Sequence, residues 1–178
     1  MSSSVSPSRP AAARPFAVCF VCTGNICRSP MAESVFRARV RDAGLDGLVL
    51  VDSAGTDGWH EGDGADPRTV ATLASTGFDT AHAARQFHAD WFDRLDLVIA
   101  LDRGHLRTLR RLAPTPRDAD KVRLLRSYDP SAGPDADLDV PDPYYGDMEG
   151  FEECLKMVES ASEGLLDAVR NAVEGRAA

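Results

Sequence analysis

The sequence contains little cysteine, little tryptophan and no long apolar run, and each shortage argues against a class of protein. Only four of the 178 residues are cysteine and two are tryptophan. Four cysteines are too few for the disulfide framework of a small secreted domain, so we expect a reducing, cytoplasmic compartment. No stretch reaches the roughly 18 apolar residues that a membrane span requires. The N-terminal residues lack the apolar region of a signal peptide, and none is expected.

Positive charge is also scarce. The chain has 20 Lys and Arg against 28 Asp and Glu, a net charge of −8, and it shows no long basic run. Neither nucleic acid nor an anionic membrane is therefore an expected partner. An apolar fraction of 43% is that of an ordinary soluble domain. We expect one monomeric domain over residues 15–175, preceded by a disordered Ser/Pro/Ala-rich extension over residues 1–14.

Apolar strands and helical segments alternate along the chain. The pattern predicts strands over residues 16–21, 48–53, 97–101 and 121–126, and helices over 30–43, 67–76, 89–94, 103–113 and 149–173. Short apolar strands between helices indicate an α/β fold with a parallel sheet covered on both faces. Residues 129–145 are rich in Pro, Gly and Asp and are predicted to form a long loop, which in a compact domain usually serves a function.

The most informative segment joins the first predicted strand to the first predicted helix. It reads Cys22-Thr23-Gly24-Asn25-Ile26-Cys27-Arg28-Ser29. Successive backbone N–H groups in such a loop, together with the helix N-terminus, can surround a tetrahedral anion. Arg28 can hold two of its oxygens with a planar fork, and Gly24 lets the backbone come close to the ligand.

The same positive surroundings favour a reactive thiolate at Cys22, to which Ser29 can donate a hydrogen bond. The segment therefore predicts a phosphate-binding loop with a nucleophile at its base. An ordinary reading also exists, in which a cysteine ends a strand and Pro30 occupies the first position of the helix.

Phosphoryl transfer needs an acid for the leaving oxygen, and the best candidate is Asp142. It lies in the segment Val140-Pro141-Asp142-Pro143-Tyr144-Tyr145-Gly146. Two prolines fix the backbone around this carboxyl, and two aromatic rings follow it. Taken alone, the segment is better explained as a rigid turn whose tyrosines pack on the domain.

Together, these two segments resemble the low-molecular-weight protein tyrosine phosphatases. The likeness covers about residues 15–170 and continues through Asp52-Ser53-Ala54-Gly55-Thr56, Trp59, Asp66-Pro67-Arg68, Ala81-His82, Ala84-Arg85-Gln86 and Ser127-Tyr128-Asp129-Pro130. The resemblance implies a four-stranded, flavodoxin-like fold and phosphotyrosine proteins as substrates. It also implies that Cys22 attacks phosphorus while Asp142 protonates the leaving oxygen, without metal or cofactor.

Supporting roles follow from the same resemblance. Asn25 is expected in a left-handed conformation, which costs an ordinary residue about 1–2 kcal/mol. The resemblance implies that Ser53 and His82 form hydrogen bonds to the loop, and that Asp102 belongs to the same network. Trp59, Tyr144 and Tyr145 are expected to line a slot for a phenol ring, too deep for the shorter phosphoserine. His60, His88 and His105 show no metal-ligand spacing.

Three alternatives remain at this point. An arsenate reductase on this scaffold would need further cysteines, and the chain has none between Cys27 and Cys154. A protein-arginine phosphatase would typically carry threonine where this chain has Ile26. A catalytically inactive phosphopeptide-binding module would have no use for Asp142. Cys27, close to Cys22 in sequence, either fills space behind the loop or protects the nucleophile from oxidation.

Overall fold

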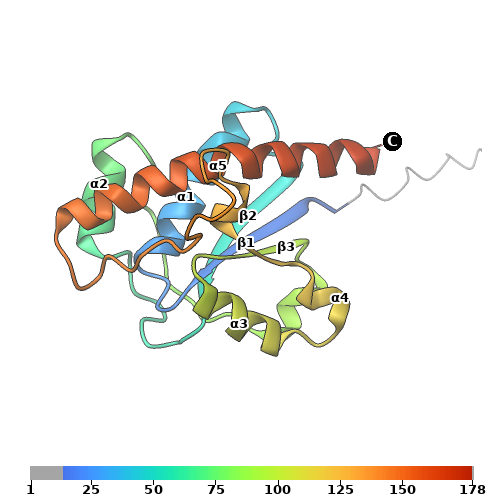
Figure 1. Ribbon diagram of the computed structural model, residues 1–178, viewed down its shortest axis with the longest axis horizontal. Coiled ribbons are helices and arrows are strands. Elements are labelled where there is room, and N and C mark those ends of the chain that lie inside the picture. The colour runs from blue at the N-terminus through green and yellow to red at the C-terminus, as the bar shows by residue number, and fades with distance from the viewer. Residues whose placement is uncertain (1–13, 178) are drawn as a thin grey trace, which may run out of the picture.

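The computed structural model describes residues 14–177, and the predicted disordered extension therefore lies, except for Arg14, outside the described residues. Four parallel strands form one sheet in the order β2-β1-β3-β4 (Figure 1). They are β1 (Phe16–Cys22), β2 (Val49–Gly55), β3 (Leu97–Ala100) and β4 (Val122–Leu124). All seven residues of β1 are buried, because this strand lies inside the sheet with helices over both faces. The predicted α/β fold is confirmed.

The helices divide between the two faces of the sheet. On one face α1 (Arg28–Asp42) and α2 (Pro67–Ser75) pack against the long α5 (Met148–Ala177), and on the other lie α3 (Arg103–Leu112) and α4 (Pro116–Ala119) (Figure 1). Short 3-10 turns, η1 (Ala89–Asp93) and η2 (Leu125–Tyr128), complete the described elements. Apolar side chains form one buried cluster on each face of the sheet; Cys154 belongs to the cluster under α1 and α5, and Cys19 belongs to the cluster on the opposite face, so both cysteines are packing residues.

Some predicted boundaries are wrong. The predicted strand over residues 121–126 is only three residues long, and the chain turns into η2 at Leu125. Helix α4 is not among the predicted elements; it is a single turn that Thr115 caps through the Asp118 N–H and that begins with Pro116. Helix α1 begins at Arg28, two residues before the predicted start, which places Arg28 and Ser29 in its first turn.

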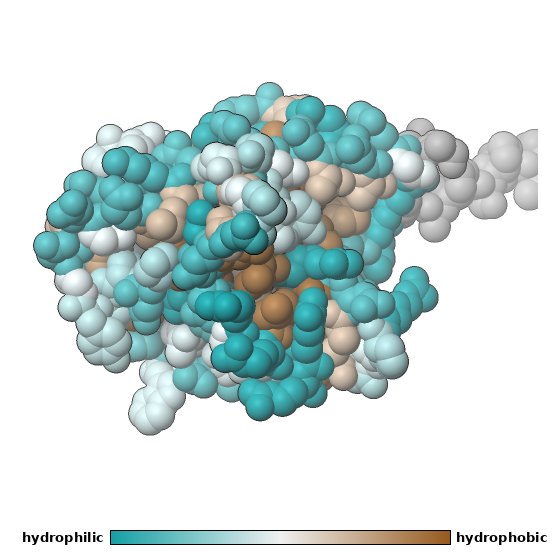
Figure 2. Space-filling view, viewed as in Figure 1, coloured by the Kyte–Doolittle hydropathy of each residue, from teal (hydrophilic) through white to brown (hydrophobic). Residues whose placement is uncertain are grey.

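Polar residues cover most of the face seen in Figure 2, and hydrophobic residues show mainly in a small central area. Within residues 14–177, no helix combines the length and the apolar character needed to cross a lipid bilayer.

Candidate active site

A tight loop follows β1 at the carboxyl end of the sheet, where ligands of parallel α/β sheets bind. Strand β1 ends at Cys22 and helix α1 begins at Arg28, so five residues make the turn between them. Gly55 of β2 lies beside Cys22, and a Cβ at this position would come within 2.6 Å of the Thr23 carbonyl oxygen. The loop can lie this close to β2 only because position 55 has no side chain.

Asn25 holds the middle of this loop. Its φ of 58° is the only positive value of a non-glycine residue among residues 14–177, as expected from the sequence. Its amide nitrogen donates to Ser29 Oγ at 2.8 Å and to Ser53 Oγ at 2.9 Å. The Arg85 N–H donates to its amide oxygen, and His82 Nε2 lies 2.6 Å from its carbonyl oxygen. These contacts offset the cost of the left-handed backbone.

The Cys22 sulfur lies at the base of the loop, 2.9 Å from Ser29 Oγ. Ser29 Oγ accepts a hydrogen bond from Asn25, and its own proton can point at the sulfur or at the Ala54 carbonyl oxygen, which is farther away at 3.4 Å. A serine hydroxyl that donates to sulfur stabilises the thiolate, the nucleophilic form of cysteine. Cys22 is only 3% exposed, so a reacting group must enter through the mouth of the loop.

Arg28 is buried at the opposite end of the loop. Its Nη1 donates to Asp102 Oδ2 at 2.7 Å and to the Val140 carbonyl oxygen at 3.0 Å. Burial opposes the charge of Arg28, but the neighbouring negative groups, Cys22 first, outweigh it and raise the pKa of the guanidinium. Arg28 therefore stays charged and fixed in direction, as an anion clamp requires.

Asp102 contacts the loop through Arg28, whereas Ser53 and His82 contact it through Asn25. It caps α3 through the His105 N–H and holds Arg28. Burial disfavours its charged form, but the hydrogen bonds from the His105 N–H and from Arg28 keep the pKa of Asp102 below its usual value.

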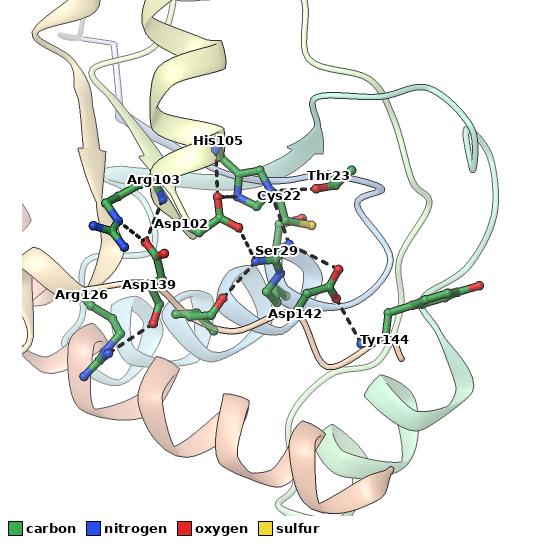
Figure 3. Close-up of polar contacts among 12 residues, drawn as sticks. Cys22, Thr23, Ser29, Asp102, Arg103, His105, Arg126, Asp139, Asp142 and Tyr144 are labelled. Carbon is green, nitrogen blue, oxygen red and sulfur yellow. Dashed lines mark hydrogen bonds and ion pairs between the residues drawn. The ribbon is translucent and has the colours of Figure 1, made fainter. Parts of the chain in front are cut away.

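Asp142 reaches the same place from the loop before α5. Its Oδ2 lies 3.8 Å from Arg28 Nη2, and its Oδ1 accepts a hydrogen bond from the Tyr144 N–H at 3.1 Å (Figure 3). The side chain is 43% exposed. Asp142 thus faces the mouth of the loop and can exchange protons with a ligand and with water.

Besides Arg28, which binds the Val140 carbonyl oxygen, further arginines hold the Asp142 loop on the body of the protein. Arg126 donates to the Asp139 carbonyl oxygen at 3.2 Å, upstream of Asp142. Arg68 donates to the carbonyl oxygens of Tyr144 and Gly146, both at 2.9 Å, and its remaining donors bind the Asp66 carboxylate. The Asp66 N–H in turn donates to the Ile26 carbonyl oxygen, which connects this anchor to the phosphate-binding loop.

A pocket of about 230 Å³ opens above the Cys22 sulfur. Its lining includes the predicted residues Cys22, Thr23, Gly24, Ile26, Cys27, Arg28, Trp59, Asp142, Tyr144 and Tyr145, with Asp57 and His60 in addition. The side chains of Asn25 and Ser29 are fully buried behind the loop backbone and do not line the pocket. The volume is small for a ligand site, where about 300–1,000 Å³ is common, and suits one phosphoryl group with one ring.

Aromatic side chains form the outer part of the pocket. Trp59 is 86% and Tyr145 is 90% exposed, which is unusual for large rings that are not contacting a ligand. Tyr144 and Tyr145 pack edge to face, with ring centroids 5.0 Å apart. The three rings surround the entrance rather than the core, in the arrangement expected for a slot.

Reasoning from sequence missed His105 and Arg68 as parts of this site. His105 was considered only as a metal ligand, although the spacing Asp102-x-x-His105 at a helix start is a signal that it faces the capping aspartate. Among residues 14–177, no group of His, Cys, Asp and Glu side chains has the arrangement of a metal site.

A buried cysteine beneath an arginine-closed anion loop, with a carboxyl group above it, has the parts for transferring a phosphoryl group to sulfur. The fold and the site therefore define a cysteine-based phosphatase of the α/β class.

Comparisons with known proteins agree with this class. A sequence model described as low molecular weight phosphotyrosine protein phosphatase matches residues 17–175. A low molecular weight protein-tyrosine-phosphatase of Streptomyces coelicolor is 74% identical over 92% of this chain and 99% of its own. Low molecular weight protein-tyrosine phosphatase A of Mycobacterium tuberculosis is 50% identical over 87% and 92%, respectively. The crystal structure of YfkJ from Bacillus subtilis superposes with a TM-score of 0.81 at 36% identity, covering 89% of this chain and 96% of that one.

The chain belongs to the low molecular weight protein tyrosine phosphatase family. Its enzyme class is that of a hydrolase of phosphate monoesters.

Proposed function

We propose that this chain dephosphorylates tyrosine residues of proteins, with Cys22 as nucleophile, Asp142 as general acid and base, and Arg28 as phosphate clamp. The observation that carries the proposal is that all three side chains line one pocket. The remaining loop residues, Thr23–Cys27 and Ser29, supply backbone amides and support for the loop.

The reaction has two steps. The Cys22 thiolate attacks phosphorus while Asp142 gives its proton to the departing tyrosine oxygen, so that a sulfur–phosphorus bond replaces the oxygen–phosphorus bond. Asp142, now ionised, takes a proton from water as the water oxygen attacks the phosphocysteine. Phosphate leaves, and the thiolate and the protonated Asp142 are restored. Arg28 and the loop amides stabilise the charge on the equatorial oxygens in both steps.

The aromatic entrance supports phosphotyrosine as the substrate group. A phenol ring can stack between Trp59, Tyr144 and Tyr145 while its phosphate reaches the loop. Phosphoserine is too short to span this distance. Ile26 lines the pocket with an apolar side chain, which favours a phenyl ester over a charged phosphoguanidinium.

The wider setting follows from composition. We propose a cytoplasmic, monomeric enzyme formed by residues 15–175, which binds neither nucleic acid nor membranes and uses no cofactor. The net charge of −8 supports the exclusion of nucleic acid and anionic membranes, because polyanionic partners would be repelled.

Cys22→Ser tests the nucleophile. We expect it to abolish hydrolysis of p-nitrophenyl phosphate and of a phosphotyrosine peptide, and to prevent the trapping of a phosphoenzyme by acid quench. Binding of inorganic phosphate should remain, because backbone amides and Arg28 provide most of the site. Cys19→Ser, the same change on the buried opposite face of β1, is the control and should stay active. Activity of Cys22→Ser within tenfold of the wild type would contradict the mechanism.

Two further measurements complete the test. Arg28→Lys keeps the charge but loses the two-pronged fork, so we expect most activity to disappear. Arg39→Lys, away from the loop on the side of α1 that faces Glu159 of α5, is its control. A phosphoserine peptide should be a poor substrate for the wild type, and equal rates on the two peptides would disprove the proposed selectivity.

A further inference from the structure

A buried histidine that the reaction does not use lies against the phosphate-binding loop. His105, in the first turn of α3, is 4% exposed. Its Nε2 lies 2.8 Å from Thr23 Oγ1 and 3.4 Å from Arg28 Nη2, and its Nδ1 lies 3.3 Å from Asp102 Oδ1 (Figure 3). The His105 ring therefore contacts Thr23, which follows the nucleophile, as well as Arg28 and the Asp102 carboxylate that binds Arg28.

These contacts determine where the ring carries its proton. An arginine nitrogen can only donate, so the Nε2 atom that faces it must present its lone pair. The Thr23 hydroxyl can then donate to the same atom. The ring proton lies on Nδ1, which points toward Asp102 but is left without a well-aligned hydrogen bond. Burial first, and then the charge of Arg28, lower the pKa of His105 to about 4, so the ring is neutral.

We propose that His105 is a positioning residue, whose neutral imidazole accepts hydrogen bonds from Thr23 and Arg28 and so ties together the two ends of the phosphate-binding loop. This inference rests on the proposed function of the loop.

The geometry explains why Arg28 needs this contact. Its Nη1 is fixed by Asp102 and Val140, but its Nη2 has, among residues 14–177, only His105 at 3.4 Å and Asp142 at 3.8 Å as polar partners. Without His105, the nearest acceptor is the proposed acid, and Nη2 would turn toward Asp142 and away from the phosphate. The Thr23 end of the loop would lose its side-chain anchor at the same time.

Two replacements of His105 distinguish its role as a hydrogen-bond acceptor from a role in filling space. His105→Phe keeps a ring but no acceptor, whereas His105→Gln can place its amide oxygen near the position of Nε2. In the Cys22→Ser background, we expect His105→Phe to weaken the binding of inorganic phosphate, measured by calorimetry, about 10- to 100-fold, the range for a lost hydrogen bond to a charged group. His105→Gln should stay within about threefold of the unmodified background. In the active enzyme, we expect kcat/KM for p-nitrophenyl phosphate to fall more in His105→Phe than in His105→Gln.

Thr23→Val supplies an independent readout, because it removes the hydroxyl and keeps the shape of the side chain. We expect a several-fold loss of phosphate affinity, and no further loss when it is combined with His105→Phe, since both changes remove the same contact. His88→Phe replaces an exposed histidine and is the control.

Three results would overturn the proposal: phosphate affinity unchanged in His105→Phe, equal losses in the Phe and Gln variants, or additive losses with Thr23→Val. If thermal melts show that the His105 variants do not fold, Thr23→Val decides, and unchanged affinity overturns the proposal. Failure of the proposed function is distinguishable from these results, because it would appear as absent phosphoenzyme in the wild type.

Discussion

Arg28 and Asp142 face each other across the pocket, with 3.8 Å between Nη2 of the arginine and Oδ2 of the aspartate. The helix that follows β1 supplies the first residue, and the loop before α5 supplies the second. A phosphate bound by Arg28 would therefore have its leaving oxygen near Asp142, as an in-line transfer from oxygen to sulfur requires. Arg28 would bind the phosphate, whereas Asp142 would protonate its leaving oxygen. Kinetic measurements on variants of the two residues can therefore separate binding from proton transfer.

Asp142→Asn removes the proton donor and keeps the shape of the side chain. We expect kcat for phosphotyrosine to fall about 10²- to 10⁴-fold, the usual range for loss of a general acid. The loss should shrink for aryl phosphates with strongly acidic phenols, whose oxygen leaves without a proton. Steady-state kinetics over a series of phenols measures this dependence, with Asp137→Asn in the same loop as control. Equal losses across the series would mean that Asp142 has a structural role only.

The sequence predicted the parts of the site that are local in the chain. Cys22 and Arg28 belong to one short segment, and its residue types alone require a tight loop at a helix start. The left-handed Asn25 followed from the same segment. The predicted boundaries were wrong where the length of a strand depends on its pairing with a distant strand. At β4, only Val122–Leu124 pairs with β3, so the strand is shorter than predicted.

The role of His105 was out of reach for a different reason. Its contacts with Thr23 and Arg28 join segments 82 and 77 residues apart. No periodicity or spacing in the sequence reports such a contact, because it arises only when β1 and β3 become neighbours in the sheet. For the same reason, the sequence could place Asp102 in the network of the loop but could not identify Arg28 as its partner.

Gly164 allows α5 to pack closely against η2. A Cβ at this position would lie 1.8 Å from the Tyr128 carbonyl oxygen, so the helix or the turn must move in Gly164→Ala. We expect a loss of about 1–3 kcal/mol in the free energy of unfolding, the usual cost of overpacking. The melting temperature should fall by several degrees, at about 2–4 °C per kcal/mol for a chain of this size. Gly175→Ala in the same helix meets nothing within 4 Å and should be neutral or stabilising; equal melting temperatures for the two variants would contradict this account.

Cys27 allows a test of protection against oxidation. Peroxide converts a reactive cysteine to a sulfenic acid, which a second thiol can capture as a disulfide with release of water. Cys27 is buried, and this burial, followed by the charge of Asp66, raises the pKa of its thiol to about 12, so it reacts only once Cys22 is oxidised. We expect peroxide to inactivate the wild type in a form that dithiothreitol restores, and bound phosphate to protect.

Cys27→Ser should keep substantial activity but become irreversibly inactivated by the same exposure. Cys19→Ala, on the opposite face of β1, should recover like the wild type. Full recovery of Cys27→Ser after reduction would exclude Cys27 as the protecting thiol and leave it a packing residue.

His105 makes the stability of the fold depend on pH in a defined window. Its pKa is about 4 in the folded protein against 6.5 for an ordinary histidine, mainly because it is buried. Below pH 6.5 the unfolded chain takes up a proton that the folded protein refuses until about pH 4, so stability falls as the pH falls through this range and is unaffected above it. At 1.36 kcal/mol per pKa unit, the wild type should lose on the order of 3 kcal/mol relative to His105→Gln between pH 7 and pH 4. Urea unfolding at intervals across this range measures the difference, with His88→Gln as an exposed control. Parallel stability curves for the wild type and His105→Gln would show that His105 takes up its proton equally in the folded and unfolded protein, and would remove the basis for a ring that stays neutral as an acceptor.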